Sequence, residues 1–187
     1  MDTENTPGNG KAIAMRDSAL IAAAEQAKAA VHARYQLALA RPRNLDEVRV
    51  RLLAECKRPR FAAVARYSVP RGGSTISGPS IRFAEAALRC LGNAYPEVTT
   101  VYDDEDKRIV RVAVMDLESN LTYSRDIMFA KTTERRKLRD GERPLSVRTG
   151  SSGQTVYVVR ATEDDLANRE AALISKALRG HALRILP

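Results

Sequence analysis

The sequence predicts an α+β domain in which an antiparallel β-meander is packed by helices on one side. Two observations lead to this fold class. The spacing of apolar residues changes from a helical period before residue 93 to a period of two after residue 95, so helices and strands occupy separate stretches of the chain. Short acidic or polar turns separate the β-like runs, which indicates antiparallel neighbours. Segregation of this kind is typical of α+β proteins.

The chain begins with a polar segment, residues 1–12, which is rich in Gly, Pro and Asn and is predicted to be a disordered tail. Residues 13–187 are predicted to form a single domain. Between residues 17 and 40 the sequence is rich in alanine, and apolar residues recur at helical spacing. These residues are Ile21, Ala24, Val31 and Ala38. Arg41-Pro42-Arg43 is expected to end this helix, because proline cannot continue it.

Two shorter helices are expected before residue 93. Asn44, with Glu47 three residues later, is typical of a helix N-terminus, and an apolar stripe follows at Leu45, Val48, Leu52 and Cys56. In the next helix Gly78 is expected to permit a backbone turn, and Pro79 to preset φ for the first helical turn. Its apolar face comprises Ile81, Ala84, Leu88 and Leu91, and Gly92-Asn93 is a typical helix end.

Three β-like runs follow, at about residues 95–102, 107–117 and 121–130. The turns between them are Asp103-Asp104-Glu105-Asp106 and Glu118-Ser119-Asn120. Four acidic residues at a hairpin tip usually face solvent, so the acidic turn is not interpreted as a metal site.

Residues 131–153 form a polar, basic excursion with seven basic residues against three acidic ones, a net charge of +4. A short β run at 154–160 follows, and Thr162 is expected to cap a last helix whose first turn is acidic. The core-facing stripe of that helix is predicted to comprise Ala167, Ala171, Ile174, Leu178, His181 and Ile185.

The 187 residues carry 31 Lys and Arg against 23 Asp and Glu, which gives a net charge of +8 and a pI near 9.8. A basic excess of this size favours a polyanionic partner, either nucleic acid or an anionic membrane surface. No apolar run of membrane length and no signal peptide is visible in the sequence, so a cytoplasmic setting is expected and no membrane partner.

Enzyme chemistry is poorly represented in the sequence. The glycine-rich segment 65–93 lacks the Gly-Lys-Ser/Thr of a phosphate-binding P-loop, and no nucleophile elbow, zincin motif or dinucleotide fingerprint occurs. The two cysteines and two histidines stand apart from one another, so neither metal ligands nor a disulfide is indicated. We therefore expect no catalytic residue, no metal and no cofactor.

Nucleic-acid binding is better represented, because Lys and Arg neutralise phosphates and aromatic faces accept unpaired bases. Tyr67 lies beside Arg66 and Arg71, and Tyr157 lies near Arg160. Several cations of the basic excursion are predicted to line a groove for a DNA strand; they are Lys131, Arg135, Arg136, Lys137 and Arg139. Arg148 of the same excursion is a further predicted DNA contact. Two other interpretations stay open here: the tyrosines could be ordinary strand residues, and the excursion could be a solvated loop.

The stretch "SVPRGGSTISGPSIRFAEAALRCLGN" resembles a motif of the phage single-strand annealing recombinases of the RecT/Redβ type. The matching residues are Pro70, Arg71, Gly73, Ile76, Gly78, Pro79, Ser80, Arg82, Ala84, Glu85, Gly92 and Asn93. "VMDLESNLTYSRDI" and "ALISKALRGHALRILP" resemble two later segments of that family, so the likeness runs from about residue 60 to 187. Two features depart from the family pattern: Cys90-Leu91 stands where an aromatic is expected, and the basic excursion is long.

The resemblance implies ATP-independent annealing of complementary DNA strands in phage homologous recombination, inside the bacterial host. It implies a homo-oligomer, a ring or a helical filament, that holds single-stranded DNA and the annealed duplex intermediate along a basic groove. A phage exonuclease or a host single-strand-binding protein is a further partner. Arg82, which with Arg66 and Arg71 brackets the motif, is placed near the DNA backbone, although it could instead pair with Glu85.

Two other functions remain open at this point. The chain could be a general nucleic-acid-binding module without annealing activity, or a basic assembly or virion protein. Family members often continue past the proline that corresponds to Pro187, which leaves open whether a C-terminal region is missing.

Overall fold

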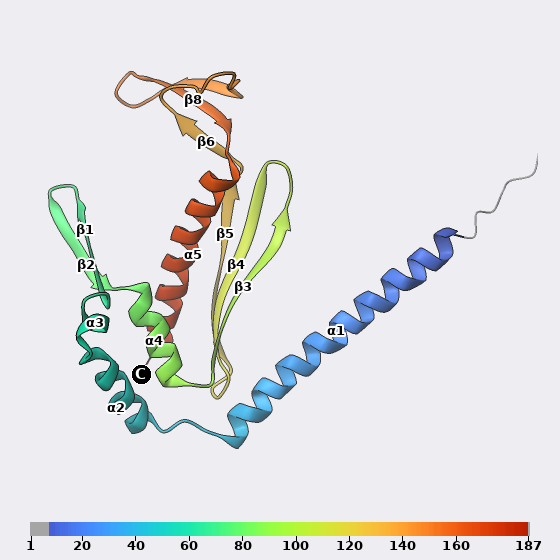
Figure 1. The fold of residues 1–187 in the computed structure, drawn as a ribbon, viewed down its shortest axis with the longest axis vertical. Helices are drawn as coiled ribbons and strands as arrows, with labels where there is room; N and C mark the ends of the chain where they lie inside the picture. The colour runs from blue at the N-terminus through green and yellow to red at the C-terminus, as the bar shows by residue number, and fades with distance from the viewer. Residues whose placement is uncertain (1–7, 187) are drawn as a thin grey trace, which may run out of the picture. The chain divides into compact units, whose positions relative to one another are not determined.

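The computed structural model describes the backbone of residues 8–186, with side chains from Asp17 onward. The chain divides into two compact units, residues 1–42 and residues 43–187. The first unit contains one long helix, α1 (Gly8–Ala40), which ends just before Arg41-Pro42 (Figure 1). Of the predicted tail, residues 8–12 belong to this helix, and residues 1–7 lie outside the described part. The single domain predicted for residues 13–187 is thus divided after Pro42.

The second unit contains four helices and eight strands among the described residues. The helices are α2 (Leu45–Cys56), α3 (Pro59–Ala62), α4 (Ile81–Leu91) and α5 (Glu163–Ile185). The strands are β1 (Arg66–Arg71), β2 (Ser74–Pro79), β3 (Ala94–Asp103), β4 (Lys107–Asp116), β5 (Leu121–Ala130), β6 (Thr132–Arg135), β7 (Ser146–Thr149) and β8 (Thr155–Arg160).

These strands form three antiparallel sheets. They are the hairpin β1-β2, the meander β3-β4-β5 and a small sheet in the order β6-β8-β7. The predicted α+β class with an antiparallel meander is confirmed. Two segments without predicted strands are also sheet: the glycine segment is the β1-β2 hairpin, and the basic excursion contributes β6 and β7.

The core forms where α5 packs across one face of the meander (Figure 1). In β4 the alternate residues Val110, Val112 and Val114 are buried on this face, and Phe129 of β5 is 1% exposed beside them. From α5, Ile174 and Leu178 of the predicted stripe pack against these strand residues. Ala167 and Ala171, which were also assigned to the stripe, are exposed. The apolar area removed from water here is the main stabilising contribution to the unit.

Helix α4 completes the core by packing between α5 and α2. Its small residues Ala84, Ala86 and Ala87 are buried and allow the close approach of the neighbouring helices. Ser80 is the N-cap: its hydroxyl accepts from the Phe83 amide at 3.2 Å and donates to the Val64 carbonyl at 2.6 Å. Pro79 is therefore the last residue of β2, and it does not open the helix as the sequence suggested.

A cluster of charged groups joins the segment before α2 to the turn between β4 and β5. The Arg43 guanidinium, 9% exposed, pairs with Asp116 and lies 2.9 Å from Glu118. Burial works to raise the pKa of Asp116, but hydrogen bonds from Ser119, the Glu118 amide and Arg43 outweigh it and lower the pKa. Asn44 caps α2 beside this cluster by accepting from the Asp46 and Glu47 amides, as its position in the sequence predicts.

Across residues 8–186, no helix combines the length and the apolar character needed to cross a membrane.

We expect Phe129→Ala to lower the free energy of unfolding by about 3–5 kcal/mol, because it leaves a cavity under α5. Met128 is the matched control, since it neighbours Phe129 in β5 but is 65% exposed. Met128→Ala should change the stability by less than about 0.5 kcal/mol. Urea unfolding followed by circular dichroism measures both values. Similar losses for the two variants would contradict the assignment of this face as the core.

Candidate nucleic-acid interface

The β1-β2 hairpin carries the first group of predicted DNA-contacting residues. Gly72 and Gly73, with φ of 55° and 81°, form its two-residue turn, a conformation that glycine adopts without strain. Arg71 flanks this turn, is exposed, and has no ion-pair partner among residues 17–186. Arg66, at the other end of β1, is also exposed and donates to the Ser77 hydroxyl at 3.4 Å. The hairpin thus presents two cations that no carboxylate of residues 17–186 neutralises.

The Tyr67 ring lies close both to the neighbouring strand β2 and to helix α5. Gly78 is its direct cross-strand partner, and a Cβ built at Gly78 would lie 3.1 Å from Tyr67 Cε1. The Arg179 guanidinium of α5 lies over the same ring, 4.4 Å from its centroid. Gly78 is therefore needed for the close approach of an aromatic ring, not for the backbone turn that the sequence suggested.

A second stack of the same kind joins α5 to the edge strand β5. The Arg184 guanidinium lies over the Tyr123 ring, 4.2 Å from its centroid. Arg179, Arg184 and Tyr123 were not among the predicted site residues. The available signal was that both arginines lie near the end of the last helix and outside its apolar stripe.

Three of the predicted DNA-contacting cations of the basic excursion have carboxylate partners within the fold. Lys131 pairs with Asp103 at 2.7 Å, and Arg148 pairs with Glu134 at 2.6 Å. Arg135, whose side chain is 17% exposed, pairs with Asp165 at 2.8 Å. Because Asp165 also forms the capping box with Thr162, this pair fixes the small sheet against the first turn of α5. These cations have a structural use that sequence alone did not reveal.

The acidic turn between β3 and β4 neutralises much of the neighbouring positive charge. Asp103 accepts from Lys131 and Arg108, and these bonds lower the pKa of its carboxyl. Asp106 lies 3.5 Å from Arg160, which also donates to the Glu105 carbonyl. The predicted DNA contact Arg160 is therefore held at this turn.

The remaining predicted residues lie in three different settings. Arg136, Lys137 and Arg139 are exposed in the segment after β6, and no ion pair involves them in the described part of the chain. Tyr157 is half-buried in the centre of the small sheet, opposite Arg135 and Val147. Arg82 lies 3.5 Å from Glu85, as one reading of the sequence allowed, yet its side chain is 71% exposed.

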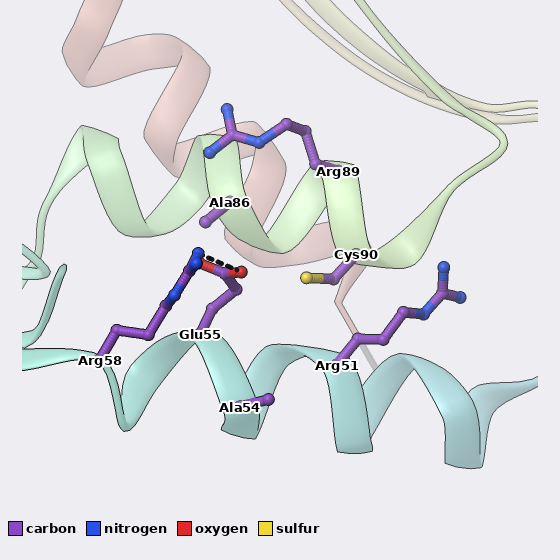
Figure 2. A pocket seen from close by; sticks show the side chains of 7 residues that line it. All are labelled: Arg51, Ala54, Glu55, Arg58, Ala86, Arg89 and Cys90. Atoms are coloured by element: carbon purple, nitrogen blue, oxygen red, sulfur yellow. Dashed lines mark hydrogen bonds and ion pairs between the residues drawn. The ribbon is translucent and has the colours of Figure 1, made fainter.

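A depression of about 460 Å³ between α2 and α4 is lined by Arg51, Arg58 and Arg89 among other residues. Figure 2 shows that Arg58 turns toward Glu55, to which it donates at 3.0 and 3.1 Å, whereas Arg51 and Arg89 point in different directions. The guanidinium groups therefore do not converge on one point. Cys90 lies in the wall, and burial raises the pKa of its thiol, which disfavours the reactive thiolate.

Residues 17–186 contain no cluster of His, Cys, Asp and Glu side chains that could hold a metal ion. Comparisons of the chain with models of protein families, with curated proteins and with solved structures find no match. What the chain binds therefore has to be inferred from its own residues.

We expect Gly78→Val to displace the Tyr67 ring from Arg179 and to lower the free energy of unfolding by about 1–3 kcal/mol. In a Tyr67→Ala background the same substitution should cost much less, because the ring that it clashes with is gone. Urea unfolding of the four proteins in this double-mutant cycle gives the coupling energy. An equal loss in both backgrounds would show that Gly78 is required for another reason.

Proposed function

We propose that this chain binds single-stranded DNA and anneals complementary strands without ATP in phage homologous recombination. The observation that carries the proposal is the pair of arginine–tyrosine stacks that flank α5, formed by Arg179 with Tyr67 and Arg184 with Tyr123. No catalytic residue, metal or cofactor is part of the proposal.

Each stack offers both kinds of contact that a single strand needs. A guanidinium that lies over a ring keeps its in-plane N–H groups available for phosphate oxygens. Neither Arg179 nor Arg184 has an ion-pair partner within residues 17–186. The face of each guanidinium that points away from its ring accepts an unpaired base whatever its identity, which supports binding that tolerates any sequence.

The exposed cations away from α5 extend the same surface chemistry. Arg66 and Arg71 lie on the hairpin whose Tyr67 joins the first stack, and the group Arg136, Lys137 and Arg139 follows β6. Their positive charge attracts a polyanion over a distance and neutralises phosphates on contact.

The resemblance of residues 70–93 to the RecT/Redβ-type recombinases makes annealing the specific activity proposed. With it comes a homo-oligomer, because neighbouring copies would hold one strand in register while its bases remain open to a complement. A phage exonuclease or a host single-strand-binding protein is the further partner proposed, in the cytoplasm of the bacterial host.

The test of this proposal is an annealing assay with two complementary, fluorescently labelled oligonucleotides and no ATP. The wild-type chain should accelerate annealing, and Arg179→Ala should weaken strand binding by roughly tenfold, since stacking contributes about 1–3 kcal/mol per base. Arg111→Ala is the matched control, because Arg111 pairs with Asp126 at 2.8 Å and neither residue belongs to the stacks. Tight binding without faster annealing would refute the annealing activity and leave a general nucleic-acid-binding module.

We expect the affinity for a single strand to fall steeply with salt, with a slope of about −0.7 per neutralised phosphate. Replacing Arg136, Lys137 and Arg139 together by alanine should flatten the log–log slope by about two units if each contacts a phosphate. A triple alanine variant at Arg49 of α2, Lys57 at the C-cap of α2 and Arg60 of α3 removes the same charge from exposed positions and should leave the slope nearly unchanged. Fluorescence anisotropy at several salt concentrations measures the slopes, and equal slopes for the two variants would exclude the segment after β6 from the interface.

A further inference from the structure

A groove runs between α5 and the edge strand β5 and has a volume of about 330 Å³. Ile127 of β5 and Leu173 and Ala177 of α5 form its apolar part. One water molecule occupies about 30 Å³ in the liquid, so the groove can hold a group many times larger. It differs from the depression between α2 and α4, because no carboxylate belongs to its lining.

Three cations line this groove without a counterion. They are Arg125 from β5 and Lys176 and Arg184 from α5. All three are exposed, and none forms an ion pair with another residue of the described part of the chain. Arg125 is also the residue that interrupts the apolar face of β5, where it lies opposite buried Val112. Like charges gathered without a partner repel one another, so an anion between them would be stabilised.

His181 supplies the buried wall of the groove and is only 8% exposed. Neither of its ring nitrogens has a hydrogen-bond partner within residues 17–186. A buried polar group left in this state costs free energy. Both nitrogens are covered by neighbouring atoms, so a ligand that displaces these atoms and accepts the N–H would remove that cost. Burial lowers the pKa of His181, and the nearby Arg184 and Arg125 lower it further, which favours the neutral form of the ring.

Gly180 leaves the helical side of the groove open. It lies in the interior of α5, where glycine is less favourable than alanine by about 1 kcal/mol, and a Cβ at this position would meet no atom within 4 Å. The missing side chain is therefore not required by packing. It leaves space in the lining beside His181 and Lys176.

We propose that this groove binds a phosphate group, with Arg125, Lys176 and Arg184 neutralising its charge and the His181 ring donating a hydrogen bond to one oxygen. A phosphate has several acceptor oxygens and carries the negative charge that three cations require. The Arg184–Tyr123 stack at the same end of α5 would place a base or sugar beside it. That the phosphate comes from a DNA strand rests on the proposed function, whereas the phosphate site itself does not.

The decisive variant is Gly180→Leu, which fills the groove and keeps every cation and His181. Because leucine forms helices better than glycine, the stability should not fall, yet the affinity for inorganic phosphate should fall about tenfold or more. Ala172→Leu, on an exposed part of α5 outside the lining, is the matched control and should change the affinity less than about twofold.

The measurement is an NMR titration of the histidine ring signals with inorganic phosphate at constant ionic strength. The chain has two histidines, so His32 of α1 serves as the internal reference. Phosphate should shift the His181 signals and leave those of His32 unchanged. Unshifted His181 signals, or an unchanged phosphate affinity in Gly180→Leu, would overturn the proposal.

A second titration uses a short single-stranded oligonucleotide without terminal phosphates, so that only backbone phosphodiesters can enter the groove. A shift of His181 with this probe supports a DNA strand as the source, and a shift with inorganic phosphate alone supports a free or terminal phosphate. If the chain anneals strands but the His181 signals do not respond to either probe, the phosphate site is refuted and the proposed annealing function is retained. If the groove binds phosphate but the chain does not anneal strands, the phosphate site is supported and the proposed annealing function is refuted.

Discussion

The packing of α5 against one face of the meander is the constraint on which the rest of the second unit depends. Val110, Val112 and Val114 alternate along β4 and are buried under the helix, and Phe129 fills the space beside them. Helix α4 packs on α5 through apolar residues, whereas the hairpin and the small sheet are attached to α5 by polar contacts. The hairpin joins it through Arg179 and Tyr67, and the small sheet joins it through the pair of Arg135 with Asp165.

The same helix provides both the core and the surface proposed to bind DNA. Its stripe of Ile174 and Leu178 faces the meander, whereas Lys176 and Arg184 line the groove along β5. A helix that is anchored over its whole length holds the cations on its other sides at fixed separations. Such positions are more rigid than positions on loops, which favours repeated contacts with a regular polyanion.

Some basic side chains pair with carboxylates inside the fold, and others remain available to a partner. Carboxylates of the acidic turn neutralise Lys131 and Arg160, and a carboxylate in the first turn of α5 neutralises Arg135. The available cations are those for which the fold supplies no acid, at the hairpin, after β6 and along α5. The net charge of +8 therefore indicates the class of partner, whereas the pairing indicates where on the surface such a partner can bind.

The sequence by itself determined the features that depend on neighbouring residues. Asn44 and Thr162 are helix caps at their predicted positions, and the three runs after residue 95 form the meander, because caps, turns and apolar periods are local patterns. The β1-β2 hairpin was not predicted. Its strands are short, mostly exposed and interrupted by prolines, so they lack the alternation that marks a strand with one buried face.

Only the tertiary structure decided which charged and aromatic residues meet. Arg135 reaches Asp165 and Arg179 reaches Tyr67 across long separations in the chain, and nothing local distinguishes these arginines from Arg71, which stays unpaired in the described part of the chain. The role of Gly78 likewise follows from the ring opposite it, and not from its own backbone angles. The sequence shows that an arginine, and therefore a positive charge, is present at a position. Whether that charge is neutralised depends on its distance to a carboxylate, and folding alone sets that distance.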